Sequence, residues 1–254
     1  MKYVLPLNTR KTERGAIHFW CRLVARAASF ALLCVAILGS ASAETLHYSV
    51  NWPSGLSLGE ATLRSDQVVS GKGSAIGWTF ELNLDAGVPG FAIRDQYSST
   101  ANADFCSSQL DKRIARGART SEERVIFDPS EKTATRESIS SGQVAETSQV
   151  SVPTCARDAL TLLQFVRREL AQGRLPSSQP AILGAAYQVH LEYLGTSTVL
   201  LGNQQIDADR FRTSINGPAS DLTLEIFFRR DAVRTPVMIK IPLSLATFTV
   251  ELIP

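Results

Sequence analysis

Apolar and polar residues alternate along most of the chain from residue 44 onward, and this pattern constrains the fold more than any other feature. The first segment, LHYSVNW (46–52), places Leu46, Tyr48, Val50 and Trp52 on one face and polar residues on the other. The same alternation recurs in WTFELNL (78–84), YQVHLEYL (187–194), LTLEIFF (222–228) and VMIKI (237–241). Alternate side chains of a strand point to opposite faces, so each segment predicts a strand with one buried and one solvated face. This arrangement is typical of antiparallel sheets, and the chain is predicted to be mainly β.

One segment, TCARDALTLLQFVRRELAQG (154–173), has the spacing of an amphipathic helix instead. Its apolar stripe consists of Ala159, Leu162, Leu163, Val166 and Leu170. Thr154 or Asp158 can cap the start, and Gly173 can end the helix. The only apolar surface that can bury the stripe is a sheet face. We therefore expect a curved antiparallel sheet or open β-barrel with this helix packed on its concave face.

The first 43 residues have the pattern of a signal peptide. Residues 1–26 carry six Lys or Arg residues against a single acid, and an uncharged apolar run, 27–39, follows. Ala41 and Ala43 then occupy the small-residue positions of a cleavage site. We expect a Sec-type signal (1–43), cleavage after Ala43, and one exported, periplasmic, β-rich domain (44–254). The alternative is a membrane anchor, although the run is short against the roughly 20 residues that span a bilayer.

Charge and cysteine content both fit an exported domain. Without the leader the chain has 20 basic and 23 acidic residues, so the basic excess of the whole sequence belongs to the leader. Nothing therefore indicates a nucleic-acid partner, which would require a basic patch on the folded domain. Two of the four cysteines lie in the leader. The two in the domain, Cys106 and Cys155, are expected to form a disulfide, with two buried free thiols as the alternative. A metal site is not expected, because His47 and His190 are the only histidines of the domain and their spacing from the cysteines is not that of metal ligands.

Two further segments bear on the organisation of the domain. Residues 133–149 are polar on both faces, which predicts exposed edge strands or a long hairpin, whose charges would discourage edge-to-edge aggregation. Residues 172–184 (QGRLPSSQPAILG) have the composition of a linker. The chain would then consist of a block of strands, the helix, and a second block of strands.

Several motifs resemble those of the bacterial exported proteins of domain-of-unknown-function family 3108. These are the opening LHYSVNWPSGLSLGEATL (46–63), the helix segment with Asp158, Leu160 and Arg167, the following GRLP, and the closing segment with Asp231, Arg234 and Pro236. The resemblance covers nearly the whole domain. It implies an exported domain and a curved sheet akin to the lipoprotein carriers of the bacterial envelope. It supplies no activity, cofactor or catalytic residue.

No pattern in the sequence indicates an enzyme or a cofactor. His47 and His190 fall on the polar faces of predicted strands, and the nucleophile motif G-x-S-x-G is absent. The acids Glu81, Asp85 and Asp95 are expected to lie scattered over solvated strand faces. The segment SGKGS (70–74) lacks the spacing of a phosphate-binding loop and predicts a hairpin turn.

The densest polar cluster is RRDAVRTP (229–236). Asp231 among three arginines, Arg229, Arg230 and Arg234, could bind an anionic head group. The alternative is a turn that an Asp–Arg pair holds together, with Pro236 preceding the last strand.

Aromatic residues provide the remaining functional hypothesis. The candidate lining of a ligand pocket consists of Trp52, Trp78, Phe80, Phe165 and Phe228. A half-barrel with one covering helix can leave an apolar pocket, and we expect a hydrophobic or amphipathic ligand such as a lipid or lipoprotein acyl chain. In the alternative, the same side chains fill a solid core. The protein would then be an interaction or assembly factor that contacts another envelope protein through the edge at 133–149.

Overall fold

The computed structural model describes residues 43–69, 75–219, 221–242 and 246–254. The predicted leader up to residue 42 and the predicted turn at 70–74 lie outside these residues. The N-terminal strands are β1 (Glu44–Asn51), β2 (Ser57–Val69), β3 (Ala75–Val88), β4 (Phe91–Asn102), β5 (Ser107–Arg116), β6 (Arg119–Asp128), β7 (Thr133–Ser140) and β8 (Gln143–Ser151). Helix α2 (Ala159–Ala171) follows. The C-terminal strands are β9 (Gln179–Ile182), β10 (Ala186–Leu201), β11 (Gln204–Asn216), β12 (Asp221–Arg229), β13 (Pro236–Pro242) and β14 (Thr247–Leu252).

All fourteen strands belong to one sheet, in the order β8-β7-β6-β5-β4-β3-β2-β1-β14-β13-β12-β11-β10-β9. Each strand therefore neighbours the next one in the chain, except that β8 and β9 lie far apart in the sheet, and the pairing of β1 with β14 joins the two blocks. The pairs are antiparallel, as the alternation predicts. Strands β8 and β9 form the two edges, and the sheet is not closed into a barrel.

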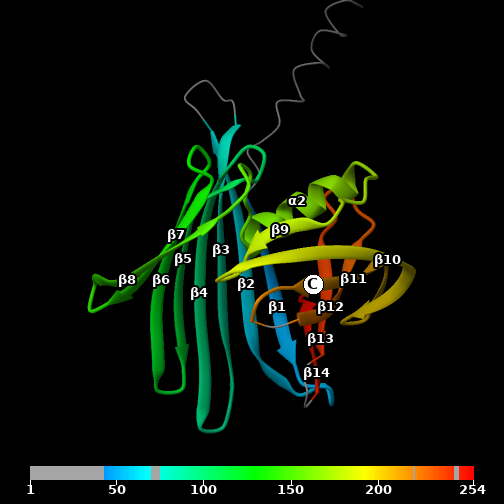
Figure 1. The fold of residues 1–254 in the computed structure, drawn as a ribbon. Helices are drawn as coiled ribbons and strands as arrows, with labels where there is room; N and C mark the ends of the chain where they lie inside the picture. The colour runs from blue at the N-terminus through cyan, green and yellow to red at the C-terminus, as the bar shows by residue number, and fades with distance from the viewer. Residues whose placement is uncertain (1–42, 70–74, 220, 243–245) are drawn as a thin grey trace, which may run out of the picture. The chain divides into compact units, whose positions relative to one another are not determined.

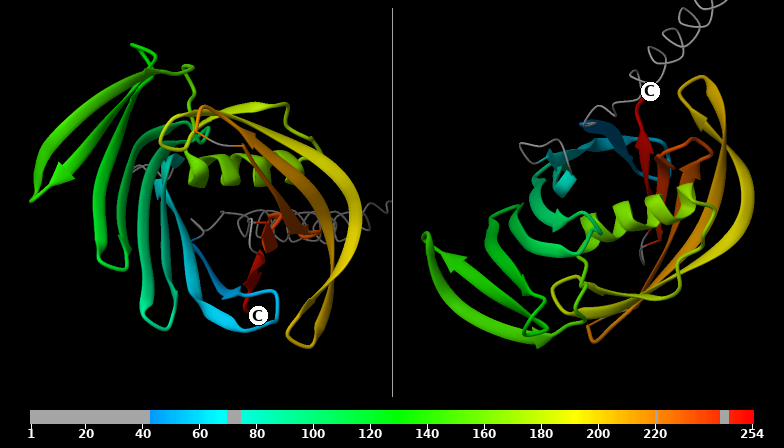
Figure 2. Two further views of the ribbon diagram at one scale, coloured as in Figure 1. Left: turned by 60° about the horizontal axis from the view of Figure 1, so that its bottom comes forward. Right: turned by 90° about the horizontal axis from the view of Figure 1, so that it is seen from above.

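The connection between the two edges is the segment that contains α2. The sheet curves around this helix, which lies across its concave face (Figures 1 and 2). The alternation explains the contact, because every second residue of β1, β2 and β3 points to that face, and Tyr48, Leu63 and Phe80 are buried there. The helix contributes Leu160 to the same cluster and Val166 to a second one against the C-terminal strands. The predicted fold class is confirmed.

Asp158 caps the helix and is fully buried. One carboxylate oxygen accepts hydrogen bonds from the backbone N–H groups of Leu160 (2.8 Å) and Thr161 (3.1 Å), as an N-cap residue does. The other accepts from the hydroxyls of Ser99 (2.5 Å) and Ser107 (2.8 Å). These two serines lie on β4 and β5, so the cap also attaches the start of the helix to the sheet.

The disulfide forms between Cys106 and Cys155, with 49 residues of sequence separation. Cys106 precedes β5, and Cys155 lies in the segment between β8 and α2. The predicted disulfide is confirmed, and the cross-link holds the entry of the helix against the β4–β5 connection.

The prediction for residues 133–149 is confirmed, whereas that for residues 172–184 is only partly correct. Residues 133–149 form the hairpin of β7 and β8, and β8 is an exposed edge strand, as predicted. The linker prediction for 172–184 is wrong for its second half, because Gln179–Ile182 forms β9 and pairs with β10. Ala181 and Ile182 are buried there, which a linker would not require.

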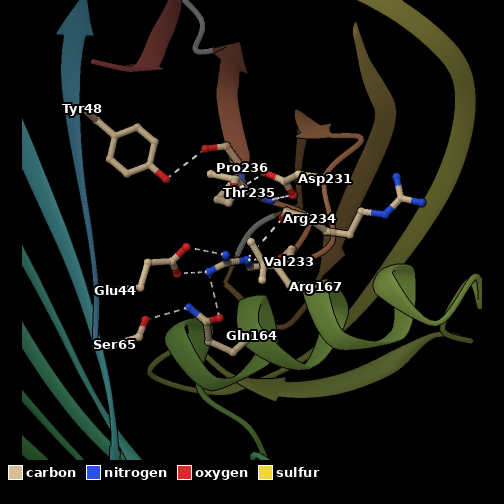
Figure 3. Close-up of polar contacts among 10 residues, drawn as sticks. All are labelled: Glu44, Tyr48, Ser65, Gln164, Arg167, Asp231, Val233, Arg234, Thr235 and Pro236. Carbon is tan, nitrogen blue, oxygen red and sulfur yellow. Dashed lines mark hydrogen bonds and ion pairs between the residues drawn. The ribbon is translucent and has the colours of Figure 1, made fainter. Parts of the chain in front are cut away.

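A buried polar network joins α2 to both blocks of strands (Figure 3). The Arg167 guanidinium donates to both carboxylate oxygens of Glu44 on β1, at 2.6 and 2.8 Å. Its Nε also donates to the carbonyl of Val233 (3.1 Å), before β13, and Nη1 donates to Gln164 (3.0 Å). Only 5% of the Arg167 side chain and 27% of the Glu44 side chain are exposed, so the pair is largely withdrawn from water.

Tyr48 lies beside this network and predicts a pH dependence of stability. Its hydroxyl donates to the carbonyl of Pro236 at 3.0 Å, and burial raises the pKa of the phenol above its usual value near 10. The unfolded chain therefore loses this proton first, and the stability from the neutral phenol is present below about pH 10 and lost as the pH rises. Above about pH 10, we expect the free energy of unfolding of wild type to fall with pH more steeply than that of Tyr48→Phe, by up to about 1.4 kcal/mol per pH unit. Urea unfolding between neutral pH and pH 11, about one unit above the usual pKa of a phenol, measures this difference. Parallel pH profiles of stability for the two proteins would contradict the prediction.

Candidate functional site

A cavity of about 500 Å³ lies between the concave face of the sheet and the first turns of α2. Its walls come from β1 to β4, from β13 and β14, and from Leu160 and Leu163 of the helix. Among the described residues that line it, none is charged. Representative wall residues are Val50, Ala61, Leu63, Leu82, Leu84, Ala86, Ile93, Ile239 and Val250. Its volume lies in the range of roughly 300–1,000 Å³ that is usual for small-molecule sites.

The mouth of this cavity lies at the hairpin ends of the N-terminal strands. The β1–β2 and β3–β4 turns lie at the same end of the sheet, because Asn51 pairs with Ser57 and Gly59 with Ala86. Exposed apolar residues surround the opening there, namely Trp52 (36% exposed), Val88 (49%) and Phe91 (46%). The Trp52 ring packs edge-on against Phe248 of β14, with the centroids 4.9 Å apart. The described residues that line this opening are apolar, which favours the entry of an apolar molecule.

A second cavity of about 420 Å³ adjoins the first. The two share wall residues Leu82, Leu84 and Leu160. The second cavity is partly polar, because Asp95, Tyr97, Lys112 and Arg116 also line it. A smaller third cavity, of about 120 Å³, lies between α2 and strands β10 to β12.

Asp95 corrects one expectation from the sequence. It is 1% exposed and points to the concave face, whereas Glu81 and Asp85 lie exposed on the outer face as expected. The reason is Arg116 on the next strand, whose Nη2 lies 2.5 Å from the Asp95 carboxylate and neutralises its charge. This hydrogen-bonded pairing raises the pKa of the Arg116 guanidinium. Tyr97 donates to the same carboxylate at 3.4 Å, and burial raises the pKa of this phenol.

Lys112 and Glu123 form a second ion pair at the polar side, with 2.6 Å between Nζ and Oε1. Only 14% of each side chain is exposed. Burial by itself would raise the pKa of Glu123, but hydrogen bonds from Lys112 and Arg136 lower it below its usual value. The concave face is therefore apolar under the helix and charged toward β5, β6 and β7.

The five aromatic residues predicted to line a pocket occupy different places. Trp52 lines the mouth of the cavity of about 500 Å³, and Phe228, fully buried, lines the cavity of about 120 Å³ under α2. Trp78 and Phe80 stack on each other and pack against Phe105. Phe165 lies under the Arg157 guanidinium, 3.8 Å from its ring centroid. The role of these residues in ligand binding stays a prediction.

The arginine-rich segment 229–236 forms a turn, but not through the expected Asp–Arg pair. Asp231 accepts hydrogen bonds from the backbone N–H (3.0 Å) and hydroxyl (2.8 Å) of Thr235. Arg234 pairs with Asp209 of β11 at 2.7 Å instead. Pro236 begins β13, which is followed by β14, so it does not precede the last strand. His47 and His190 are both exposed on the outer face, as predicted.

Sequence reasoning missed most of the cavity wall. Leu160, Ile239, Ile241 and Val250 all line the cavity, and none of them is among the aromatic residues that the sequence suggests for a pocket. Lys112 and Arg116 alternate with Leu110 and Ile114 at every second position of β5, so all four side chains point to the same face. This spacing is the signal in the sequence that indicates an inward position for the two basic residues.

No group of three or more His, Cys, Asp or Glu side chains in the described part of the chain is arranged to hold a metal ion. Nor does any helix there have the length and apolar character needed to cross a membrane.

Comparisons with known proteins address the fold and the family. The fold is similar to that of a β-barrel-like protein of the domain of unknown function DUF1849 from Brucella abortus, with a TM-score of 0.56 and 7% identity over 83% of this chain and 95% of that one. A Bacteroides fragilis protein with a YmcC-like fold gives a TM-score of only 0.29 at 9% identity, over 82% and 92% of the two chains, and supports no inference.

No curated protein sequence matches the chain. The family model for proteins of unknown function DUF3108 matches residues 47–253, which is nearly the whole described domain. This match agrees with the motifs at both ends of the domain and in the helix. The chain belongs to the DUF3108 family.

Proposed function

We propose that this protein is an exported, non-enzymatic binding protein of the cell envelope that holds a hydrophobic or amphipathic ligand, such as a lipid or an acyl chain, between its curved sheet and α2. The observation that carries the proposal is the cavity of about 500 Å³, whose described lining has no charged residue. Water finds few hydrogen-bond partners on such a surface. Each methylene group of a ligand that is buried there contributes about 0.8 kcal/mol to the free energy of binding.

The cavity also separates this function from its alternative. An interaction factor that acts through the exposed β7–β8 hairpin would work equally well with a filled core, and needs no space under the helix. The apolar residues around the mouth, Trp52, Val88 and Phe91, favour the binding function, because they continue the lining to the surface.

Export is supported by two independent features. The leader has the order of basic region, apolar run and small-residue site that signal peptides share. The domain contains the Cys106–Cys155 disulfide, which persists in oxidising compartments such as the periplasm.

Filling the cavity tests the binding function. Ala86 on β3 lines the cavity, whereas Ala92, on the adjacent strand, points to the outer face. We expect Ala86→Trp to reduce the affinity for the fluorescent fatty acid parinaric acid at least about tenfold, a loss of about 1.4 kcal/mol, and Ala92→Trp to leave it unchanged. The protein is expressed with its own leader, and urea unfolding verifies that both variants are folded. Equal affinity in the two folded variants would contradict binding in this cavity.

The native ligand can be sought directly by native mass spectrometry of the protein purified gently from the envelope. The expected result is a reproducible additional mass that organic extraction identifies as a lipid. A protein without additional mass, both as isolated and after incubation with envelope lipids, would exclude the carrier function.

A further inference from the structure

The polar side of the second cavity has a specific arrangement of hydrogen-bonding groups. Its carboxylates are already engaged by the protein. Asp95 accepts from Arg116 and Tyr97, and Asp158 accepts from two hydroxyls and two backbone N–H groups. Glu123, behind Lys112, accepts from both Lys112 and Arg136. The acidic groups therefore have little remaining capacity to bind a ligand donor.

The basic groups of the same cavity keep unused donors. Lys112 carries three N–H donors and gives one of them, to Glu123, among the described residues. Arg116 uses Nε and Nη2 on Asp95, while its Nη1 has no protein acceptor in the described part of the chain. The cavity thus presents positively charged donors with free capacity beside carboxylates that are occupied. This is the chemistry that recognises a phosphate or carboxylate.

The second, partly polar cavity shares wall residues with the apolar cavity. Leu82, Leu84 and Leu160 line both, so a molecule that contacts Lys112 can extend over the first turn of α2 into the uncharged cavity. A free anion would use only the polar part, and a plain hydrocarbon would use only the apolar part. A molecule with an anionic head and a hydrocarbon tail would use both.

We propose that the ligand is an anionic amphiphile whose phosphate or carboxylate head group binds Lys112 and Arg116, and whose hydrocarbon tail fills the apolar cavity. This inference rests on the proposed function and specifies the ligand class of the same site. The head group replaces the water on the unused N–H donors, and the ion pairs with Glu123 and Asp95 hold the two bases in position.

The test uses three probes with the same saturated tail and different heads: palmitate, hexadecanol and hexadecyltrimethylammonium. Each displaces parinaric acid from the protein expressed with its own leader. We expect palmitate to bind about tenfold more tightly than hexadecanol, and the cationic probe to bind least. We further expect Lys112→Gln to reduce palmitate affinity about five- to tenfold and to leave hexadecanol unchanged. The fold should tolerate this variant, since Glu123 keeps Arg136 as a partner.

Arg113→Gln is the matched control, because Arg113 is the next residue of β5, lies on the outer face and pairs with Glu122. It should change the affinity of no probe. Equal binding of palmitate and hexadecanol, with no effect of Lys112→Gln, would overturn the head-group assignment while leaving the proposed function intact. Failure of all three probes to bind would overturn the proposed function as well. Binding of inorganic phosphate as tightly as palmitate, insensitive to Ala86→Trp, would overturn the amphiphile and assign the cavity to a free anion.

Discussion

Replacing Arg167 by Met is expected to lower the free energy of unfolding by about 3–5 kcal/mol, the usual cost of removing one partner of a buried ion pair. The guanidinium makes two hydrogen bonds to Glu44 and others to Gln164 and to the carbonyls of Val233 and Arg234. Methionine keeps most of the side-chain volume but leaves these acceptors without a donor. The Glu44 carboxylate would then remain partly buried without its counter-ion, which is the main source of the cost.

Urea unfolding of the protein expressed with its own leader measures this effect. Arg174→Met is the control, because Arg174 also makes a two-point contact with a carboxylate, that of Glu169, but its side chain is 56% exposed. We expect that variant to unfold nearly as wild type does. The double variant Glu44→Gln/Arg167→Met should be no less stable than Arg167→Met, because it removes the unpaired charge. A loss for Arg167→Met no greater than that of the control would mean that water, rather than the protein, solvates the pair.

Removing the disulfide should have an effect of similar size. For 49 residues of sequence separation, the chain-entropy model gives a loss of about 4 kcal/mol in the free energy of unfolding of Cys106→Ala/Cys155→Ala. The cause lies mainly in the unfolded chain, which gains conformations when the loop between β5 and the helix entry opens. The folded state should retain its helix contacts, because Asp158 still binds Ser99 and Ser107.

Denaturant unfolding of wild type with and without a reducing agent gives the same quantity independently. Reduction should lower wild-type stability to that of the double variant and leave the double variant unchanged. If both changes cost less than about 1 kcal/mol, the unfolded chain must already be compact in this region, and the entropic account of the cross-link would be wrong.

Local patterns were sufficient to predict the fold class and the helix. Alternation identifies strands because side chains of a strand alternate between two faces whatever the sheet around them. The stripe of 159–170 identifies α2 for the corresponding reason, and a helix stripe with only sheet faces available must pack on one. The disulfide followed from composition, since two cysteines in an exported domain leave a single pairing. The leader and the cleavage site also came from sequence alone and stay predictions.

Other features depended on contacts between distant residues. Residues 179–182 have no alternation that distinguishes a strand from a linker, and they became β9 only because β10 offered a partner. Acidic side chains usually lie in water, and it is Arg116, 21 residues later, that permits the burial of Asp95. The partner of Arg167, Glu44, is 123 residues away, and no local pattern connects them.

The sequence by itself determined the strands that have a clear alternation, the segment that forms the helix and the two cysteines that can pair, because these depend on period, capping and number. Only the tertiary structure decided that the concave face is not filled. Whether apolar side chains meet in a solid core or surround a cavity depends on the curvature of fourteen strands and on where α2 crosses them. The placement of Lys112 and Arg116 beside the apolar cavity has the same origin, since curvature brings β5 toward the first turn of the helix.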